Sequence, residues 1–210
     1  MQVNQLQVNF QVNPDTPLLL IISGPSGVGK DSVLRALKER DLPLYHVITA
    51  NTREPRPDEK EGVDYYFVSR ERFKEMIGND ELLEYSEVYE DYKGVPKSEV
   101  RKAIETDKDV IFRLDVQGAE KIKSIYPQAI SIFLIPANQE EWFKRLGVRR
   151  MANEKDLDTR IETVQKELET IDEFNYVVVN ADNKLNETVD IIEAIITAEH
   201  HRTNKIPVDV

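Results

Sequence analysis

The chain has 210 residues, a formal net charge of −11 and no cysteine. The lack of cysteine excludes disulfides, thiolate nucleophiles and zinc–thiolate sites and fits a cytoplasmic location, while the acidic balance argues against nucleic acid as a partner. The longest apolar runs, 18–22 and 132–135, are far shorter than the roughly 20 residues that span a bilayer. We therefore expect one enzyme-sized unit with no membrane span, built as one core or as a core with one insertion.

The first elements are predicted from the change of pattern near residue 18. Residues 1–17 alternate apolar side chains with Gln and Asn, which fits an edge strand as well as an unstructured tail; we predict a tail. The apolar run 18–23 predicts a buried strand, and Val33, Leu34 and Leu37 then share one face of a predicted helix.

The stretch 24-GPSGVGKDS-32 connects that strand to that helix. In a GxxxxGK loop, glycines let backbone N–H groups curl around phosphates, and the helix N-terminus adds positive partial charge. The placement between strand and helix favours a phosphate-binding loop over a Gly-rich turn with a solvated lysine. The loop residues are Gly24, Pro25, Ser26, Gly27, Val28, Gly29, Lys30, Asp31 and Ser32.

Asp31 is the unusual member of this loop. A Ser or Thr hydroxyl normally follows the lysine and contacts Mg²⁺. A carboxylate is also a hard oxygen ligand for magnesium, but it brings negative charge close to polyphosphate. Asp31 and Ser32 are therefore both candidate metal ligands.

The segment 44–93 differs in composition from the rest of the chain. It holds most of the tyrosines and strand-like stretches such as 81–89, so we predict a small mixed insertion that contacts substrate. Arg56 lies between two prolines and Arg53 two residues before the first of them; prolines stiffen the backbone, and two guanidinium groups suit a phosphate monoester. A buried Glu84 would accept two N–H bonds from guanine. A solvated charge run and a surface glutamate are the alternatives for these residues.

From residue 110 the apolar runs 110–116, 130–135 and 176–180 alternate with predicted helices, including a closing helix near 185–201. Buried strands that alternate with helices imply a parallel sheet covered on both faces. The sequence thus predicts an α/β fold with a P-loop core.

A second charge anomaly lies in 111-IFRLDVQG-118. The acidic strand of phosphate-loop proteins usually carries a carboxylate on the magnesium side. Here Asp115 is present, but Arg113 stands two residues earlier, on the same strand face. We hypothesise a charge exchange in which Asp31 is the acid near the metal and Arg113 pairs with it or with phosphate. The alternative is that Arg113 is a peripheral strand residue.

Seven stretches of the chain together resemble the guanylate kinase family over nearly all of residues 18–201. They are GPSGVGK, TREPRPDEKEGVDYYF, LLEY, GVPK, LDVQG, RLGVRR and YVVVN. The resemblance implies transfer of phosphate from ATP to GMP or dGMP with Mg²⁺, by a protein with a parallel-sheet core, a small mixed α/β GMP-binding domain and a lid. It implies core segments 18–43, 94–136 and 173–203, a GMP-binding domain at 44–93, lid and flanking helices at 137–172, and tails at 1–17 and 204–210.

The resemblance also implies roles for individual residues. The implied GMP-binding residues are Thr49, Arg53, Arg56, Glu59, Tyr65, Glu84, Tyr92, Lys93 and Asp115. ATP would contact residues 24–32 and Asn180, and the transferred group would be stabilised by Lys30, Arg145, Arg149 and Arg160. A monomer or a homodimer is compatible with this pattern.

The sequence departs from the family at four positions besides Arg113. Thr49 keeps a serine's hydroxyl, and Lys93 stands in place of a second tyrosine and could meet phosphate as a point charge. Val95 replaces a hydroxyl that meets guanine, so base selectivity is the weakest inference, and Asp31 replaces the loop hydroxyl. Two other functions stay open at this point: a phosphosugar kinase of the ribose-bisphosphate type and a catalytically inactive binding module.

Overall fold

The computed structural model describes residues 16–88, 91–148 and 154–203; the side chains of residues 88, 148 and 154–160 are not described. Nearly all of the tail predicted at 1–17, and all of that predicted at 204–210, lies outside the described residues. Within the described chain, no helix combines the length and the apolar character needed to cross a membrane.

The core is a five-stranded parallel sheet in the order β2-β7-β1-β8-β9. Its strands are β1 (Leu19–Ser23), β2 (Leu44–His46), β7 (Asp109–Arg113), β8 (Ile130–Ile135) and β9 (Tyr176–Val179). The central strands are mostly apolar because both faces of the sheet are covered. The predicted parallel sheet is confirmed.

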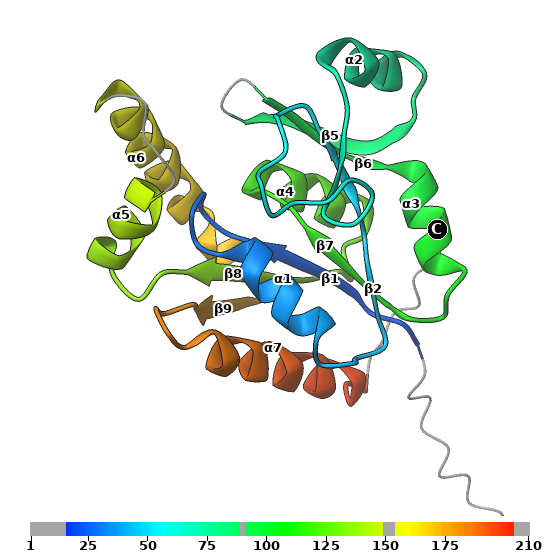
Figure 1. Cartoon of the computed structure of the whole chain (residues 1–210). Helices are drawn as coiled ribbons and strands as arrows, with labels where there is room; N and C mark the ends of the chain where they lie inside the picture. Colours follow the sequence, from blue (N-terminus) through cyan, green and yellow to red (C-terminus); the bar gives the residue numbers. More distant parts are fainter. Residues whose placement is uncertain (1–15, 89–90, 149–153, 204–210) are drawn as a thin grey trace, which may run out of the picture.

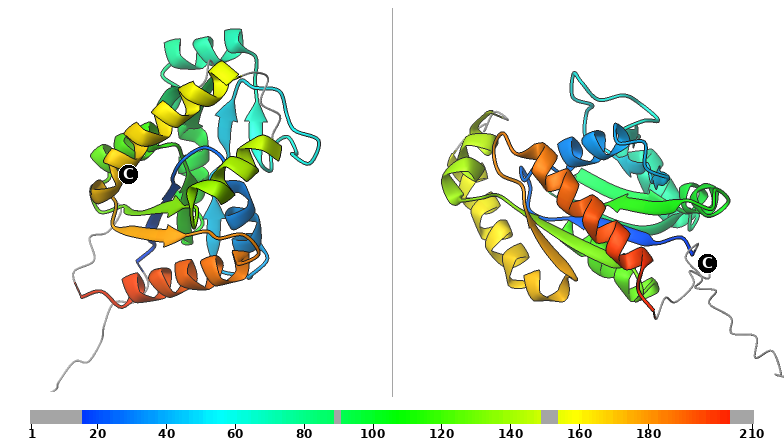
Figure 2. Two further views of the ribbon diagram at one scale, coloured as in Figure 1. Left: turned by 90° about the vertical axis from the view of Figure 1, so that its left-hand side faces the viewer. Right: turned by 90° about the horizontal axis from the view of Figure 1, so that it is seen from below.

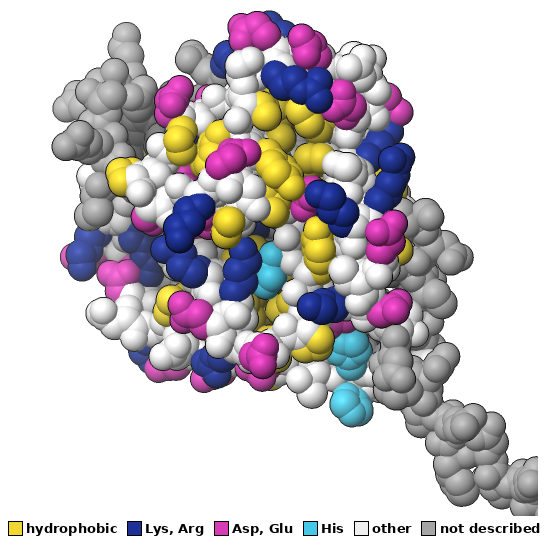
Figure 3. All heavy atoms as spheres, turned by 45° about the vertical axis from the view of Figure 1, so that its right-hand side comes forward, with side chains coloured by type: hydrophobic (Ala, Val, Ile, Leu, Met, Phe, Trp, Pro, Cys, Tyr) yellow, Lys and Arg dark blue, Asp and Glu magenta, His cyan; other side chains and the backbone are white. Residues whose placement is uncertain are grey.

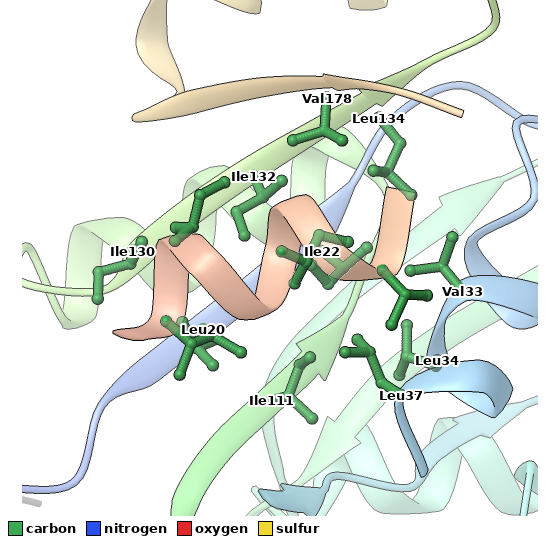
Figure 4. Close-up of a cluster of buried hydrophobic side chains, with 14 of the residues drawn as sticks. Leu20, Ile22, Val33, Leu34, Leu37, Ile111, Ile130, Ile132, Leu134 and Val178 are labelled. Atoms are coloured by element: carbon green, nitrogen blue, oxygen red, sulfur yellow. The ribbon is translucent and has the colours of Figure 1, made fainter. Parts of the chain in front are cut away.

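Helices cover both faces of this sheet (Figures 1 and 2). On one face, α1 (Lys30–Lys38) and α7 (Leu185–His200) pack against alternate strand residues such as Leu20, Ile22 and Ile132 (Figure 4). On the other face, α3 (Lys97–Ile104) and α4 (Val116–Ile125) pack against residues such as Ile21 and Phe112. The alternation of faces along β1 explains the two separate clusters.

A second sheet of four strands, in the order β4-β3-β6-β5, lies beside the core. Its strands are β3 (Thr49–Asn51), β4 (Tyr65–Phe67), β5 (Leu82–Val88) and β6 (Asp91–Pro96), and α2 (Arg70–Gly78) packs on it through Phe73 and Met76. In Figure 1 this unit lies on the opposite side of the core sheet from α7.

The predicted boundaries of this insertion need correction at both ends. β2 starts at Leu44 but hydrogen-bonds with β7 in the core sheet, so Leu44–His46 belong to the core. β6 runs to Pro96 within the second sheet, so the unit extends past residue 93. Apolar pattern alone does not indicate which sheet a three-residue strand joins.

The remaining helices are α5 (Gln139–Val148), α6 (Glu154–Glu169) and the short 3₁₀ helix η1 (Ile171–Glu173). Trp142, Leu146 and Val164 form a small cluster between α5 and α6. Trp142 Nε1 also donates to the carbonyl of Ser26 at 2.9 Å. The cluster thus joins the region predicted as the lid to the loop that follows β1.

Candidate active site

The loop that follows β1 has the backbone of a phosphate-binding loop. Gly24 and Gly29 have φ angles of 133° and 99°, which side-chain-bearing residues rarely adopt. A Cβ on Gly24 would lie 2.3 Å from the carbonyl oxygen of Leu134, and one on Gly29 would lie 2.6 Å from Nδ2 of Asn180. Gly29 is also the N-cap of α1, so the unpaired N–H groups at the start of that helix face the loop.

Lys30 follows this turn and reaches back over the loop. Its Nζ donates to the carbonyls of Gly24 at 2.5 Å and Pro25 at 3.2 Å. Burial, together with repulsion from Lys93, lowers the pKa of Lys30 to about 8. A cation held at a desolvated position gains much by meeting an anion, so the loop is suited to bind phosphate.

The loop shares one cavity, of about 240 Å³, with residues of the second sheet. The predicted site residues that line it are Gly24, Ser26, Gly27, Gly29, Lys30, Asp31, Thr49, Arg53, Arg56, Tyr65, Glu84, Lys93 and Asp115. Arg113, Asp91, Gly94, Leu114 and Glu167 complete the lining. We call this space the cleft.

Glu59 holds the two cleft arginines in place. It accepts two bonds from Arg53, at 2.7 and 2.5 Å, and one from the backbone N–H of Arg56 at 2.8 Å. Burial alone would raise the pKa of Glu59, but these bonds lower it below its ordinary value. Glu59 thus supports Arg53 and Arg56, and its own contact with GMP stays a prediction.

The predicted pairing of Arg113 with Asp31 is confirmed. Arg113 Nη1 lies 2.9 Å from Asp31 Oδ1, and Nη2 donates to the carbonyl of Asp64 at 2.5 Å. The Tyr65 hydroxyl lies 3.3 Å from Asp31 Oδ1, and Arg56 Nη1 lies 3.5 Å from Asp31 Oδ2. Asp31 therefore balances the charge of Arg113 and Arg56 at the point where α1 meets the second sheet.

Glu84 is the buried carboxylate at the far end of the cleft, with only 5% of the residue exposed. Burial, and then the nearby charge of Asp115, raises the pKa of Glu84 to about 8. Its Oε2 is buried and has no hydrogen-bond partner. Asp115, by contrast, caps α4 by accepting from the Gly118 N–H at 3.0 Å and also accepts from the Ser86 hydroxyl at 2.8 Å. Of Glu84 and Asp115, Glu84 is therefore the one with a buried oxygen that has no partner within the protein.

Glu167 is a cleft residue that the sequence analysis missed. It lies on α6, its Oε2 is buried without a partner, and burial raises its pKa to about 7 against the opposing influence of Lys30. The sequence does contain an indication of this position. Glu167 follows the predicted site residue Arg160 by seven residues, which is two helical turns along the same face. The spacing would have placed it near any site that Arg160 reaches.

Arg145 and Asn180 flank the loop on the other side. Arg145 donates to the carbonyls of Val28 and Asn180 at 3.0 and 2.8 Å and to Asp182 at 2.8 Å. Asn180 Nδ2 donates to the carbonyl of Val28 at 2.8 Å. Both residues line a separate cavity of about 370 Å³ that also includes Gly27, Gly29 and Ser32. They support the loop, and their contacts with ATP stay predictions.

A further predicted residue, Tyr92, does not line the cleft, and two others have side chains outside the described part of the chain. Tyr92 packs on Phe73, with ring centroids 5.4 Å apart, on the opposite face of β6 from Lys93, so its assignment to GMP needs correction. Arg149 lies outside the described residues, and the side chain of Arg160 is likewise outside the described part. Val95 is fully buried in the core cluster beside α3, which leaves it no surface to offer a base.

Comparison with known proteins agrees with this geometry. The sequence model of guanylate kinase matches residues 16–199. The chain belongs to the guanylate kinase family. It is 41% identical to guanylate kinase 2, chloroplastic/mitochondrial, of Oryza sativa subsp. japonica over 198 residues, which cover 94% of this chain and 70% of that protein.

Two further relatives extend the match over nearly their whole length. The guanylate kinase of Caldanaerobacter subterraneus subsp. tengcongensis is 40% identical, with 90% of each chain covered. The crystal structure of guanylate kinase from Anaplasma phagocytophilum superposes with a TM-score of 0.73 at 29% identity, over 90% of this chain and 89% of that one. The guanylate kinase fold is therefore present essentially complete.

Proposed function

We infer that this guanylate kinase transfers a phosphoryl group from ATP to GMP, and also to dGMP. One observation carries the inference beyond family membership. The phosphate loop, two arginines on a stiffened segment and a buried unpaired carboxylate line a single cleft. A donor phosphate, an acceptor phosphate and a purine edge can therefore be held together.

On the donor side, the loop supplies backbone N–H groups and Lys30 supplies a positive charge. Because the pKa of Lys30 is lowered to about 8, bound phosphate would restore its full protonation. Arg145, Arg149 and Arg160 are proposed to neutralise the moving group, as the family resemblance implies. Each of these groups acts most strongly where water is excluded.

On the acceptor side, Arg53, Arg56 and Tyr65 are proposed to bind the GMP phosphate, with Lys93 and Thr49 beside it. Arg56 and Tyr65 contact Asp31 in the structure, so the acceptor phosphate would take over these partners. Glu84 would accept the two neighbouring N–H groups of guanine, and Asp115 would lie beside the nucleoside. Adenine offers no such pair of donors.

The donor set of the loop fits Mg²⁺. Magnesium is usually bound by one or two carboxylates together with substrate phosphates, and Asp31 lines the cleft beside Lys30 with a hard oxygen ligand. Asp31 and Ser32 are proposed to hold the ion, which would neutralise charge on the donor phosphates. Arg113 orients Asp31 for this role through its 2.9 Å bond.

The reaction we propose is an in-line displacement without a covalent enzyme intermediate. Oxygen of the GMP phosphate would attack the γ-phosphorus of ATP while the bond to ADP breaks. The protein residues position the two phosphates and stabilise the charge on the moving group. Neither a phosphosugar kinase nor an inactive binding module is favoured, because the relatives are guanylate kinases and the loop keeps its glycines and lysine.

An ADP-release assay tests this function. The protein, with ATP and Mg²⁺, would be offered GMP, dGMP, AMP, UMP and a ribose phosphate, with a control that lacks acceptor. We expect turnover confined to the guanine nucleotides. Binding of GMP without turnover would instead identify a binding module, and turnover of the ribose phosphate alone would identify a phosphosugar kinase.

A further inference from the structure

A second cavity, of about 320 Å³, shares Asp31 and Arg113 with the cleft. It is enclosed by α1, the end of β2 and the segment 58–64, and we call it the outer cavity. Four cations line it: Arg35, Lys38, Lys60 and Arg113. Figure 3 shows Lys and Arg side chains gathered around a His side chain near the centre of one face of the molecule. The lining also includes Asp31, Asp58 and Asp64, so its cations outnumber its carboxylates by one, on a chain of net charge −11.

The wall of the outer cavity contains polar nitrogens without partners. The side chain of Arg113 is only 9% exposed, and its buried Nε has no hydrogen-bond partner. The Nδ1 atom of His46 is likewise buried without a partner. Lys38 Nζ lies 3.4 Å from the carbonyl of Val63, a long contact. Burial, with repulsion from Arg113 and Arg35 opposed by Asp64, lowers the pKa of Lys38. The wall therefore carries positive charge, and a buried donor in it, Arg113 Nε, has no acceptor.

The carboxylates of the outer cavity already have partners. Asp31 accepts from Arg113, Asp58 lies 3.4 Å from Arg35, and Asp64 accepts from the backbone N–H of Lys60 at 2.9 Å. A ligand with oxygen acceptors would complement the remaining donors. The described lining holds no Phe, Tyr or Trp side chain on which a nucleobase could stack, and its apolar side chains are short aliphatic ones such as Val47 and Val63.

We propose that the outer cavity is a second binding site, for a compact phosphate-bearing anion such as pyrophosphate or inorganic phosphate. Phosphate oxygens suit the Arg and Lys donors of its wall, and a volume of about 320 Å³ holds such an anion with water around it.

Occupancy of this site is coupled to the cleft through Arg113, which lines both cavities and bonds Asp31. An anion in the outer cavity attracts Arg113 away from Asp31, which leaves Asp31 to hold Arg56 and Tyr65 more strongly. It also lowers the positive potential that the acceptor phosphate meets. Both effects weaken binding of the acceptor. The coupling rests on the proposed function, whereas the anion site does not.

Binding is tested by isothermal titration of pyrophosphate into the protein without nucleotide, at constant ionic strength because surface electrostatics are screened by salt. The wild type is compared with Lys38→Met and Lys60→Met, and with Lys108→Met, which removes an exposed lysine just before β7, at the opposite end of that strand from Arg113. We expect the wild type and Lys108→Met to bind one more equivalent than the two outer-cavity variants. The same stoichiometry in all folded variants would overturn the site.

The coupling is tested in the ADP-release assay with inorganic phosphate added. We expect phosphate to raise the KM for GMP about fivefold in the wild type, the low end of typical coupling energies, and to leave kcat nearly unchanged. In Lys38→Met, phosphate should compete only at the cleft and the KM increase should be much smaller. An equal increase in both proteins would remove the coupling even if titration showed the site. An absence of turnover in any sample would instead reject the proposed function, without bearing on the titration.

Discussion

The two ends of the cleft are lined by different kinds of chemical group. At the end proposed for the phosphoryl donor, the groups are backbone groups, glycines with positive φ and a lysine that bonds two carbonyls. At the end proposed for the acceptor, they are charged side chains that hold one another, as in Arg53–Glu59 and Arg113–Asp31. The donor end is therefore fixed largely by steric limits, whereas the acceptor end depends on charge balance and is open to added anions.

The largest effect is expected at the donor end, from Lys30→Met. Loss of the cation that bonds the Gly24 and Pro25 carbonyls should lower kcat by about 10²–10³-fold, the usual result of removing a charge-stabilising donor. The midpoint of thermal unfolding should change little, because the removed charge was desolvated. Lys108→Met is the matched control, and a Lys30→Met enzyme with near-normal kcat would contradict the donor-site assignment.

At the acceptor end, Glu84→Gln should be the most damaging single change. The amide cannot accept both guanine N–H groups, and one hydrogen bond to a charged group contributes about 1.5–3 kcal/mol, so kcat/KM for GMP should fall about 10- to 100-fold. Glu87→Gln, an exposed change on the same strand, is the control. If Glu84→Gln lowered activity with ATP at limiting concentration but left the KM for GMP intact, Glu84 would not be the guanine contact.

The coupling between Asp31 and Arg113 is expected to be smaller. Asp31→Ser and Arg113→Asp should each reduce kcat/KM for GMP by about tenfold, and the double variant should recover about 1–2 kcal/mol relative to additive losses. The exposed pair Arg35–Asp58 provides a comparison, because its side chains are 51% and 68% exposed and its coupling should not exceed about 0.5 kcal/mol. Strictly additive losses for Asp31 and Arg113 would show that their bond does not contribute to catalysis.

The two ends should also separate by pH. The pKa of Glu84 is raised to about 8, so the free enzyme holds it protonated below that pH; GMP binding needs the carboxylate, and KM for GMP should fall as pH rises toward 8. The pKa of Lys30 is lowered to about 8, so the loop loses its cation above that pH and KM for ATP should rise. Each slope is at most about tenfold per pH unit. Glu84→Gln should abolish the first trend and keep the second; equal trends in both proteins would refute the assignment.

The sequence was sufficient for features that depend on short-range patterns or on a known motif. The parallel sheet followed from apolar runs such as 18–23 and 130–135, and the loop from its glycines. The Arg113–Asp31 pair, 82 residues apart in sequence, was predictable because two charge anomalies of opposite sign fell in motifs that meet at one edge of a parallel sheet.

Features set by tertiary packing were not predictable in this way. The core strand β2 is too short to indicate its partner, and Glu167 becomes a cleft residue only because α6 brings it there. Which side chains of β6 face the cleft depends on the register of β6 with β3 and β5. The pairing of β6 with β5 is irregular between Leu82 and Glu84. Adjacent strand residues point to opposite faces, so Tyr92 and Lys93, which were both assigned to GMP, do not both face the cleft.

Tyr92 provides the smallest and most specific test of that register. Its ring stacks on Phe73 at an interplanar angle of 17°, and Arg70 lies over it at 4.9 Å, both away from the cleft. Tyr92→Phe keeps the stacked ring. It should change the KM for GMP less than about twofold, because side chains alternate between the two faces of a strand and that of Tyr92 points away from the ligand. Lys93→Met, one residue along the same strand, should raise that KM about tenfold, since it removes a charge beside the acceptor phosphate. A larger effect from Tyr92→Phe than from Lys93→Met, with both variants equally stable, would require β6 to present its other face to GMP.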